Sequence, residues 1–112
     1  MTPARHNLTV YRYRDFCKDF TFLDGEKNLI PIDTWSFKSQ IRDTNCIDGT
    51  LLAEFTIDRD NENSTITLSL SDTQTALIPE DDAYWDLLVH INECDESLIC
   101  GKVKILCCVT EI

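Results

Sequence analysis

Hydrophobic and polar residues alternate along most of this chain, and the clearest case is the stretch of residues 33–43. Trp35, Phe37, Ser39 and Ile41 share one parity, while the residues between them are polar or charged. An alternation of period two predicts a β-strand with one buried face and one solvated face. Because aromatic and β-branched side chains suit a half-buried pleated surface, we expect this strand to be central and Trp35 to supply its largest apolar surface.

Similar patterns recur along the chain and predict the other strands. The further segments with strand character are 7–13, 16–23, 29–32, 51–58, 65–70, 84–91 and 98–109. Pro31 has no amide hydrogen to donate, which predicts that 29–32 lies at a sheet edge or at a crossover between sheets. The polar turn between 51–58 and 65–70 indicates a hairpin, and a longer turn is expected at residues 92–97.

Residues 71–79 break the alternation and predict one short helix. Ser71 and Gln74 have the spacing of a capping box, and Pro79 ends the segment after about one helical turn. A helix of this length is not stable alone, so we expect it to close one end of a larger fold. Together these elements predict an all-β, immunoglobulin-like antiparallel β-sandwich of about eight strands with one short crossover helix.

The length and charge of the chain indicate how many domains it has and which binding partners are excluded. Its 112 residues are typical of a single domain, so we predict one immunoglobulin-like domain over 1–112, with a flexible tail at 1–6. Twenty acidic and ten basic residues give a net charge of -10, which argues against binding to nucleic acid or anionic membranes. The polar opening lacks the apolar core of a secretory signal, so we expect synthesis in a cytoplasm.

Six cysteines allow either a disulfide framework or a set of free thiols. Disulfides persist in oxidising compartments, which a chain without a secretory signal does not reach. Free and mostly buried thiols, acting as small apolar residues, are therefore the favoured interpretation. Cys107 and Cys108 are adjacent and should point to opposite faces of the last strand.

Candidate chemical groups do not form a recognisable site. His90, Cys94 and Cys100 lack the spacing of a zinc site, and residues 58–63 have the oxygens of a calcium loop without its glycine. No local signature surrounds a nucleophilic cysteine, and the consecutive acids at 80–82 are typical of a solvated turn. We therefore predict a protein that is not an enzyme, with no catalytic residue, no metal and no cofactor.

Outward-facing residues on the first and last strands predict a contact with a partner. Tyr11, Tyr13, Leu106 and Cys108 lie on these parities, and tyrosine is enriched in contacts between chains. We predict that these four residues belong to a partner interface. The alternative is a platform of Tyr11, Tyr13 and Tyr84 that stacks on sugars, as in a carbohydrate-binding module that mediates attachment to a host surface.

Seven blocks of sequence, taken in order, resemble a known group of proteins. They are NLTVYR at 7–12, DFTF at 19–22, IDTWSFKSQIRD at 32–43, LLAEF at 51–55, ITLSLS at 66–71, YWDL at 84–87 and GKV at 101–103. In this order they resemble small Ig-like structural proteins of tailed bacteriophages, a group similar to the amino-terminal module of phage upper baseplate proteins. The resemblance covers residues 7–109.

The resemblance implies a non-enzymatic virion component, made in the host cytoplasm and located in the virion. Such a protein would be an adaptor or decoration module that docks in several copies onto tail, baseplate, neck or capsid. Its partners would be other virion structural proteins. This chain has more cysteines than the group's pattern, and no receptor-binding or fibre region is visible up to Ile112, so we expect decoration of the tail or capsid and not a baseplate fibre role.

Overall fold

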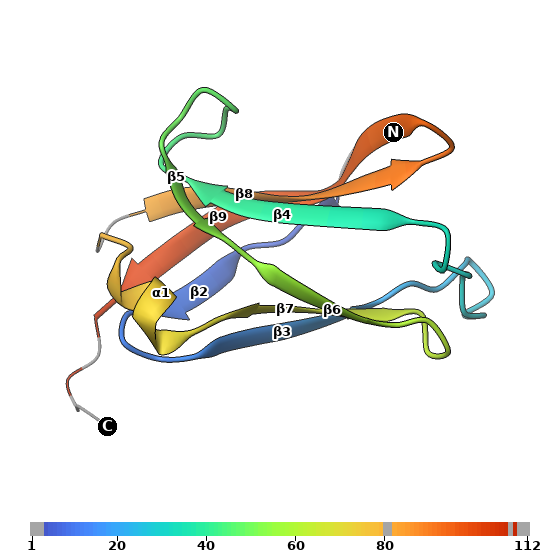
Figure 1. Ribbon diagram of the computed structural model, residues 1–112, viewed down its shortest axis with the longest axis horizontal. Helices are drawn as coiled ribbons and strands as arrows, with labels where there is room; N and C mark the ends of the chain where they lie inside the picture. Colours follow the sequence, from blue (N-terminus) through green and yellow to red (C-terminus); the bar gives the residue numbers. More distant parts are fainter. Residues whose placement is uncertain (1–3, 80–81, 108, 110–112) are drawn as a thin grey trace.

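Two β-sheets stacked face to face make up the fold, which a computed structural model describes for residues 4–79, 82–107 and 109 (Figure 1). The larger sheet, called sheet A here, has the order β1 (Ala4–Arg5), β9 (Cys94–Leu106), β8 (Asp82–Ile91), β4 (Ser36–Arg42) and β5 (Leu51–Glu54), with β2 (Leu8–Tyr11) also paired to β9. The smaller sheet, sheet B, has the order β3 (Phe16–Thr21), β7 (Thr65–Leu70) and β6 (Thr56–Asp60).

The strand order is that of an immunoglobulin sandwich. In chain order, β3, β6 and β7 correspond to the B, D and E strands of one immunoglobulin sheet, and β4, β8 and β9 to the C, F and G strands of the other. The predicted all-β, immunoglobulin-like sandwich is confirmed. One detail of the prediction is wrong, because β1 and β2 pair with β9 in parallel and the sandwich is therefore not wholly antiparallel.

The core lies between the sheets and is centred on β8 rather than on the strand that contains Trp35. β8 pairs with β4 on one side and with β9 on the other, and Trp85 is only 3% exposed. Trp35 precedes β4 and is half-buried against Phe22 and Phe37. The alternation predicted for β4, β7 and β8 is confirmed at most inward positions, although Phe37 and Ile91 are only half-buried. Those with no exposed surface are Ile41, Ile66, Leu68, Leu87 and Val89.

The predicted strand over 51–58 is two strands in different sheets. β5 belongs to sheet A and β6 to sheet B, and Phe55 lies between them with 4% exposure. The backbone N–H of Phe55 donates to the Ser39 carbonyl at 2.9 Å. A continuous alternation does not reveal such a change of sheet, because the inward parity is the same on both sides. The predicted hairpin is confirmed, with β6 antiparallel to β7.

Residues 22–35 cross from sheet B to sheet A, as Pro31 predicted for part of this segment. Ile32 is fully buried, and Leu23 and Leu29 form an isolated bridge. Arg59 on β6 holds this crossover segment against sheet B, because its guanidinium donates hydrogen bonds to the backbone carbonyls of Ile32 and Trp35.

The predicted short helix is confirmed as α1 (Asp72–Ala76), at one end of the sandwich (Figure 1). The Ser71 hydroxyl accepts a hydrogen bond from the Gln74 backbone at 3.2 Å, and the Gln74 side chain accepts one from the Ser71 backbone at 2.9 Å. The Thr75 hydroxyl donates to the Arg14 carbonyl at 2.8 Å. These bonds hold a helix too short to persist alone. Among the described residues, no helix is long and apolar enough to cross a membrane.

The turn between the last two strands is shorter than predicted. β8 ends at Ile91 and β9 begins at Cys94, so only Asn92 and Glu93 form the turn, with φ values of 51° and 65°. Two central residues with positive φ make the kind of turn whose twist matches the flanking strands. β9 ends at Leu106, and Cys107 and Val109 are exposed rather than inward as predicted.

Ala4 and Arg5, which belong to the segment predicted as a flexible tail, form β1. The N–H of His6 donates to the Cys100 carbonyl at 2.9 Å, and the Trp85 indole N–H donates to the His6 carbonyl at 2.8 Å. A two-residue strand carries no alternation that a sequence could display. Its place is fixed by these hydrogen bonds to β9 and to the core.

The prediction of free thiols is confirmed at Cys17, Cys46, Cys94 and Cys100, but the prediction that the cysteines are mostly buried is wrong. Cys17, Cys46 and Cys94 are free and exposed, while Cys100 is free and half-buried. Cys17 lies on the edge strand β3 and Cys46 in the loop before β5. Cys94 follows the turn before β9, and Cys100 faces outward on β9. None of these positions belongs to the buried core between the sheets.

Candidate functional site

The predicted interface residues are partly brought together. Tyr11 on β2 and Leu106 on β9 are register partners, and both face outward because their neighbours Val10 and Ile105 are buried. Tyr11 is 49% exposed and Leu106 is half-buried. Tyr13 is 50% exposed in the turn after β2, where the Arg12 guanidinium lies 5.1 Å from its ring centre. Cys108 lies outside the described residues.

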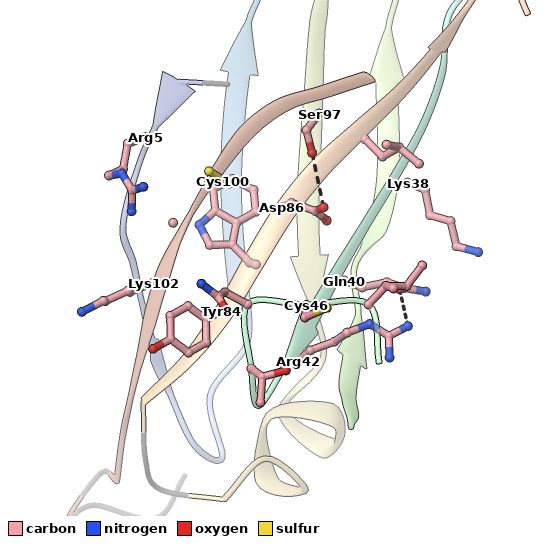
Figure 2. A pocket seen from close by; sticks show the side chains of 16 residues that line it. Arg5, Lys38, Gln40, Arg42, Cys46, Tyr84, Asp86, Ser97, Cys100 and Lys102 are labelled. Carbon is pink, nitrogen blue, oxygen red and sulfur yellow. Dashed lines mark hydrogen bonds between the residues drawn. The ribbon is translucent and has the colours of Figure 1, made fainter. Parts of the chain in front are cut away.

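A hollow of about 550 Å³ occupies the same outer face of sheet A (Figure 2). Its floor is formed by outward positions of three neighbouring strands. In register across β4, β8 and β9, these are the rows Arg42–Tyr84–Lys102, Gln40–Asp86–Cys100 and Lys38–Leu88–Ser97. Arg5, the register partner of Cys100 on β1, completes the rim beyond β9.

The loop at 43–50 forms a wall of the hollow and is held by its own hydrogen bonds. Arg42 donates through Nη1 to the Gly49 carbonyl at 2.8 Å, and the Thr50 N–H donates to the Asp43 carboxylate at 2.8 Å. A Cβ on Gly49 would lie 2.2 Å from the Thr44 hydroxyl, so any larger residue there would require the Thr44 side chain to move. Ile47 projects from the loop and is 84% exposed.

The lining is positively charged although the protein is strongly acidic. Arg5, Lys38, Arg42 and Lys102 line the hollow, and Asp86 is the one acidic residue among its lining residues. In the described part of the chain, no carboxylate forms an ion pair with Arg5, Lys38 or Lys102. Basic residues therefore outnumber acidic ones in the lining of the hollow, on a molecule whose net charge is -10.

Asp86 sits on the floor between the basic side chains. Burial raises the pKa of its carboxyl group above the ordinary value, while a hydrogen bond from Ser97 and the charge of Arg42 counteract part of that rise. The Ser97 hydroxyl lies 3.4 Å from the carboxylate, which is a long contact.

Asp86→Asn should reveal the raised pKa as a pH-dependent gain in stability. At a pH below its ordinary pKa, the Asp86 carboxyl is protonated in both the folded and the unfolded state and does not change the free energy of unfolding. As pH rises, the unfolded state ionises first, so the native protein loses stability until its own carboxyl ionises. The variant lacks this loss, so its free energy of unfolding relative to the parent should increase as pH rises through the ordinary pKa of an aspartic acid, and level off once the native carboxyl ionises, measured by urea denaturation.

Asp24→Asn is the matched control, with the opposite sign. Backbone N–H groups of Asn28 and Glu26 donate to the Asp24 carboxylate and lower its pKa. Removal of this acid should therefore cost more stability as pH rises. Parallel pH profiles for Asp86→Asn and its parent would contradict the assignment at Asp86.

The other sequence candidates do not converge on a chemical site. Nδ1 of His90 lies 2.6 Å from the Asp95 carboxylate, as an exposed pair across the β8–β9 hairpin. Both oxygens of Asp60 accept hydrogen bonds from Asn63, so this acid closes a turn. Among the described residues, no group of three or more His, Cys, Asp or Glu side chains is arranged to hold a metal ion.

Comparison with known proteins finds a distant structural likeness. No protein-family model matches the sequence, and no curated protein matches it. Among solved structures, the filamin domain of Lin-41 is similar, with a TM-score of 0.47, 18% sequence identity, and coverage of 87% of this chain and 81% of that one.

Proposed function

We propose that this protein is a non-enzymatic structural module that docks onto neighbouring protein subunits through the outer face of sheet A. Tyr11 and Leu106 carry the proposal, because they lie side by side on that face, on the edge strand β2 and its neighbour β9, with the tyrosine half-exposed. A tyrosine beside an aliphatic side chain supplies large, rigid contact area at little entropic cost, which is why tyrosine is enriched at contacts between chains.

The edges of sheet A support the same role. β5 and the β1–β2 segment are the outer strands of this sheet, and a strand at an edge has N–H and C=O groups available for pairing with another chain. Leu51 on β5 is 46% exposed, so apolar side chains are present at this edge as well. Strand addition combined with apolar contacts is a common way for one domain to bind another.

The proposed assembly is a tailed-phage virion, in which this chain is an adaptor or decoration module present in several copies. The seven sequence blocks that resemble phage Ig-like structural proteins support this part of the proposal. They fall on the strands and connections of the sandwich, so the likeness extends through the framework that presents the docking face.

Two measurements on the phage that encodes the chain test the proposal. Mass spectrometry of purified particles should detect the chain in several copies per virion. A photo-crosslinking residue at Tyr11 should then couple to another virion structural protein. The control places the photo-crosslinking residue at Asp58 instead, on the outer face of sheet B, where coupling should be much weaker. Absence of the chain from purified particles, or coupling at Asp58 alone, would overturn the proposal.

A further inference from the structure

We infer that the hollow on the outer face of sheet A binds an acidic segment of a partner protein in an extended conformation. That the occupant is a protein rests on the docking function proposed above. The inference goes further by assigning the chemistry of that partner and the residues that bind it.

The positions of the cations carry the inference. Lys38 and Arg42 lie on β4, along one side of the hollow, and Lys102 and Arg5 lie on β9 and β1, along the other (Figure 2). β8 runs between these two pairs, and two strand spacings separate β4 from β9 by roughly 10 Å. A cationic rim therefore flanks both sides of a floor formed by the middle strand.

An extended peptide matches this arrangement. Its successive side chains point to opposite sides, so a run of acidic residues along β8 would direct carboxylates alternately toward the two cationic rims. Guanidinium and ammonium groups bind carboxylates through charge-assisted hydrogen bonds. Tyr84 and Leu88 on the floor, with Ile47 on the wall, would contact apolar parts of the segment.

The charge of the whole molecule favours a short segment over a second copy of this chain. Two copies each carry a net charge of -10 and repel one another as they approach. A short acidic segment brings its carboxylates directly to the four basic residues of the lining, where Asp86 is the one opposing acid. Binding of this kind weakens as salt screens the charges.

Titration of a fluorescein-labelled octaglutamate peptide, followed by fluorescence polarisation, tests the inference. Unaltered protein should bind this peptide more weakly as the salt concentration rises, and should not bind octaserine. The double variant Lys38→Glu/Lys102→Glu should lose about tenfold or more in affinity. The milder Lys38→Gln/Lys102→Gln should show a smaller loss, and circular dichroism would verify that each variant is folded.

Lys18→Glu/Lys27→Glu is the matched control, because it changes the net charge by the same amount at exposed lysines outside the hollow. Its affinity for octaglutamate should stay within about twofold of the parent. Equal losses in the two charge-reversed variants, or no binding by the parent, would overturn the inference.

Two further outcomes would overturn it by identifying another occupant. Full displacement of the peptide by an equal concentration of inorganic phosphate would indicate a site for a free anion. Self-association of the parent that Lys38→Glu/Lys102→Glu abolishes, measured by light scattering, would indicate a second copy. Crosslinking at Tyr11 does not depend on the hollow, so the docking proposal and this inference can fail separately.

Discussion

Trp85→Ala should destabilise the fold by about 3–5 kcal/mol, enough to unfold a domain of marginal stability. The indole is 3% exposed, lies stacked on Phe20 at 5.9 Å between ring centres, and meets Phe55 edge-on at 6.2 Å. It also donates a hydrogen bond to the His6 carbonyl. The substitution would thus leave a cavity between the sheets and release the segment that follows β1. Urea denaturation monitored by circular dichroism measures the loss.

Trp35→Ala is the informative comparison for this prediction. Trp35 is half-buried and packs at the end of the sandwich against Phe22 and Phe37, so its removal should cost less than removal of Trp85. Trp85→Phe retains much of the ring packing but loses the indole N–H, and should cost about 1–3 kcal/mol from the unpaired carbonyl and the reduced volume. A larger effect at Trp35 than at Trp85 would contradict the central position of β8.

Gly101→Ala should destabilise the protein by about 2–4 kcal/mol, although it adds only one methyl group. A Cβ at this position would lie 2.1 Å from the His6 carbonyl oxygen and 2.7 Å from its carbonyl carbon. Backbone atoms at that distance must move, so the bond from Trp85 to His6 and the pairing of β1 with β9 would be lost or strained. Thermal unfolding, with hydrogen exchange of the His6 amide, measures both consequences.

Gly25→Ala provides the contrast for the Gly101 substitution. No heavy atom lies within 4 Å of a Cβ at Gly25, and neither glycine has a positive φ. Gly25→Ala should therefore leave stability unchanged or raise it by about 0.4–1 kcal/mol, through the lower entropy of the unfolded chain. If the two variants unfold at the same temperature, close approach of His6 is not the reason for glycine at 101.

The sequence predicted those parts of the fold that depend on local pattern. Ile66, Leu68 and Leu70 alternate cleanly and are buried, and the spacing of Ser71 and Gln74 forms the expected capping box. Features that depend on tertiary contacts were missed. The change of sheet at Phe55 follows from its burial between the layers, which a continuous alternation hides.

The candidate site divides in the same way. Lys38, Arg42 and Lys102 lie on the polar parity of segments that were predicted as strands, so their outward direction was readable from the sequence. Their common hollow was not, because it arises from the order β4–β8–β9 within sheet A. Arg5 belongs to the segment predicted as a flexible tail. The adjacency of Tyr11 and Leu106 likewise required the parallel pairing of β2 with β9.

That parallel pairing determines how the molecule responds to mechanical load. β1 and β2 run in the same direction as β9, so the chain enters the sandwich at one end and leaves it at the other (Figure 1). Tension applied between these two points pulls β2 and β9 in opposite directions along their length. The hydrogen bonds between β2 and β9 are then loaded together in shear. Separating the two strands in this direction requires a greater force than breaking the same hydrogen bonds one at a time.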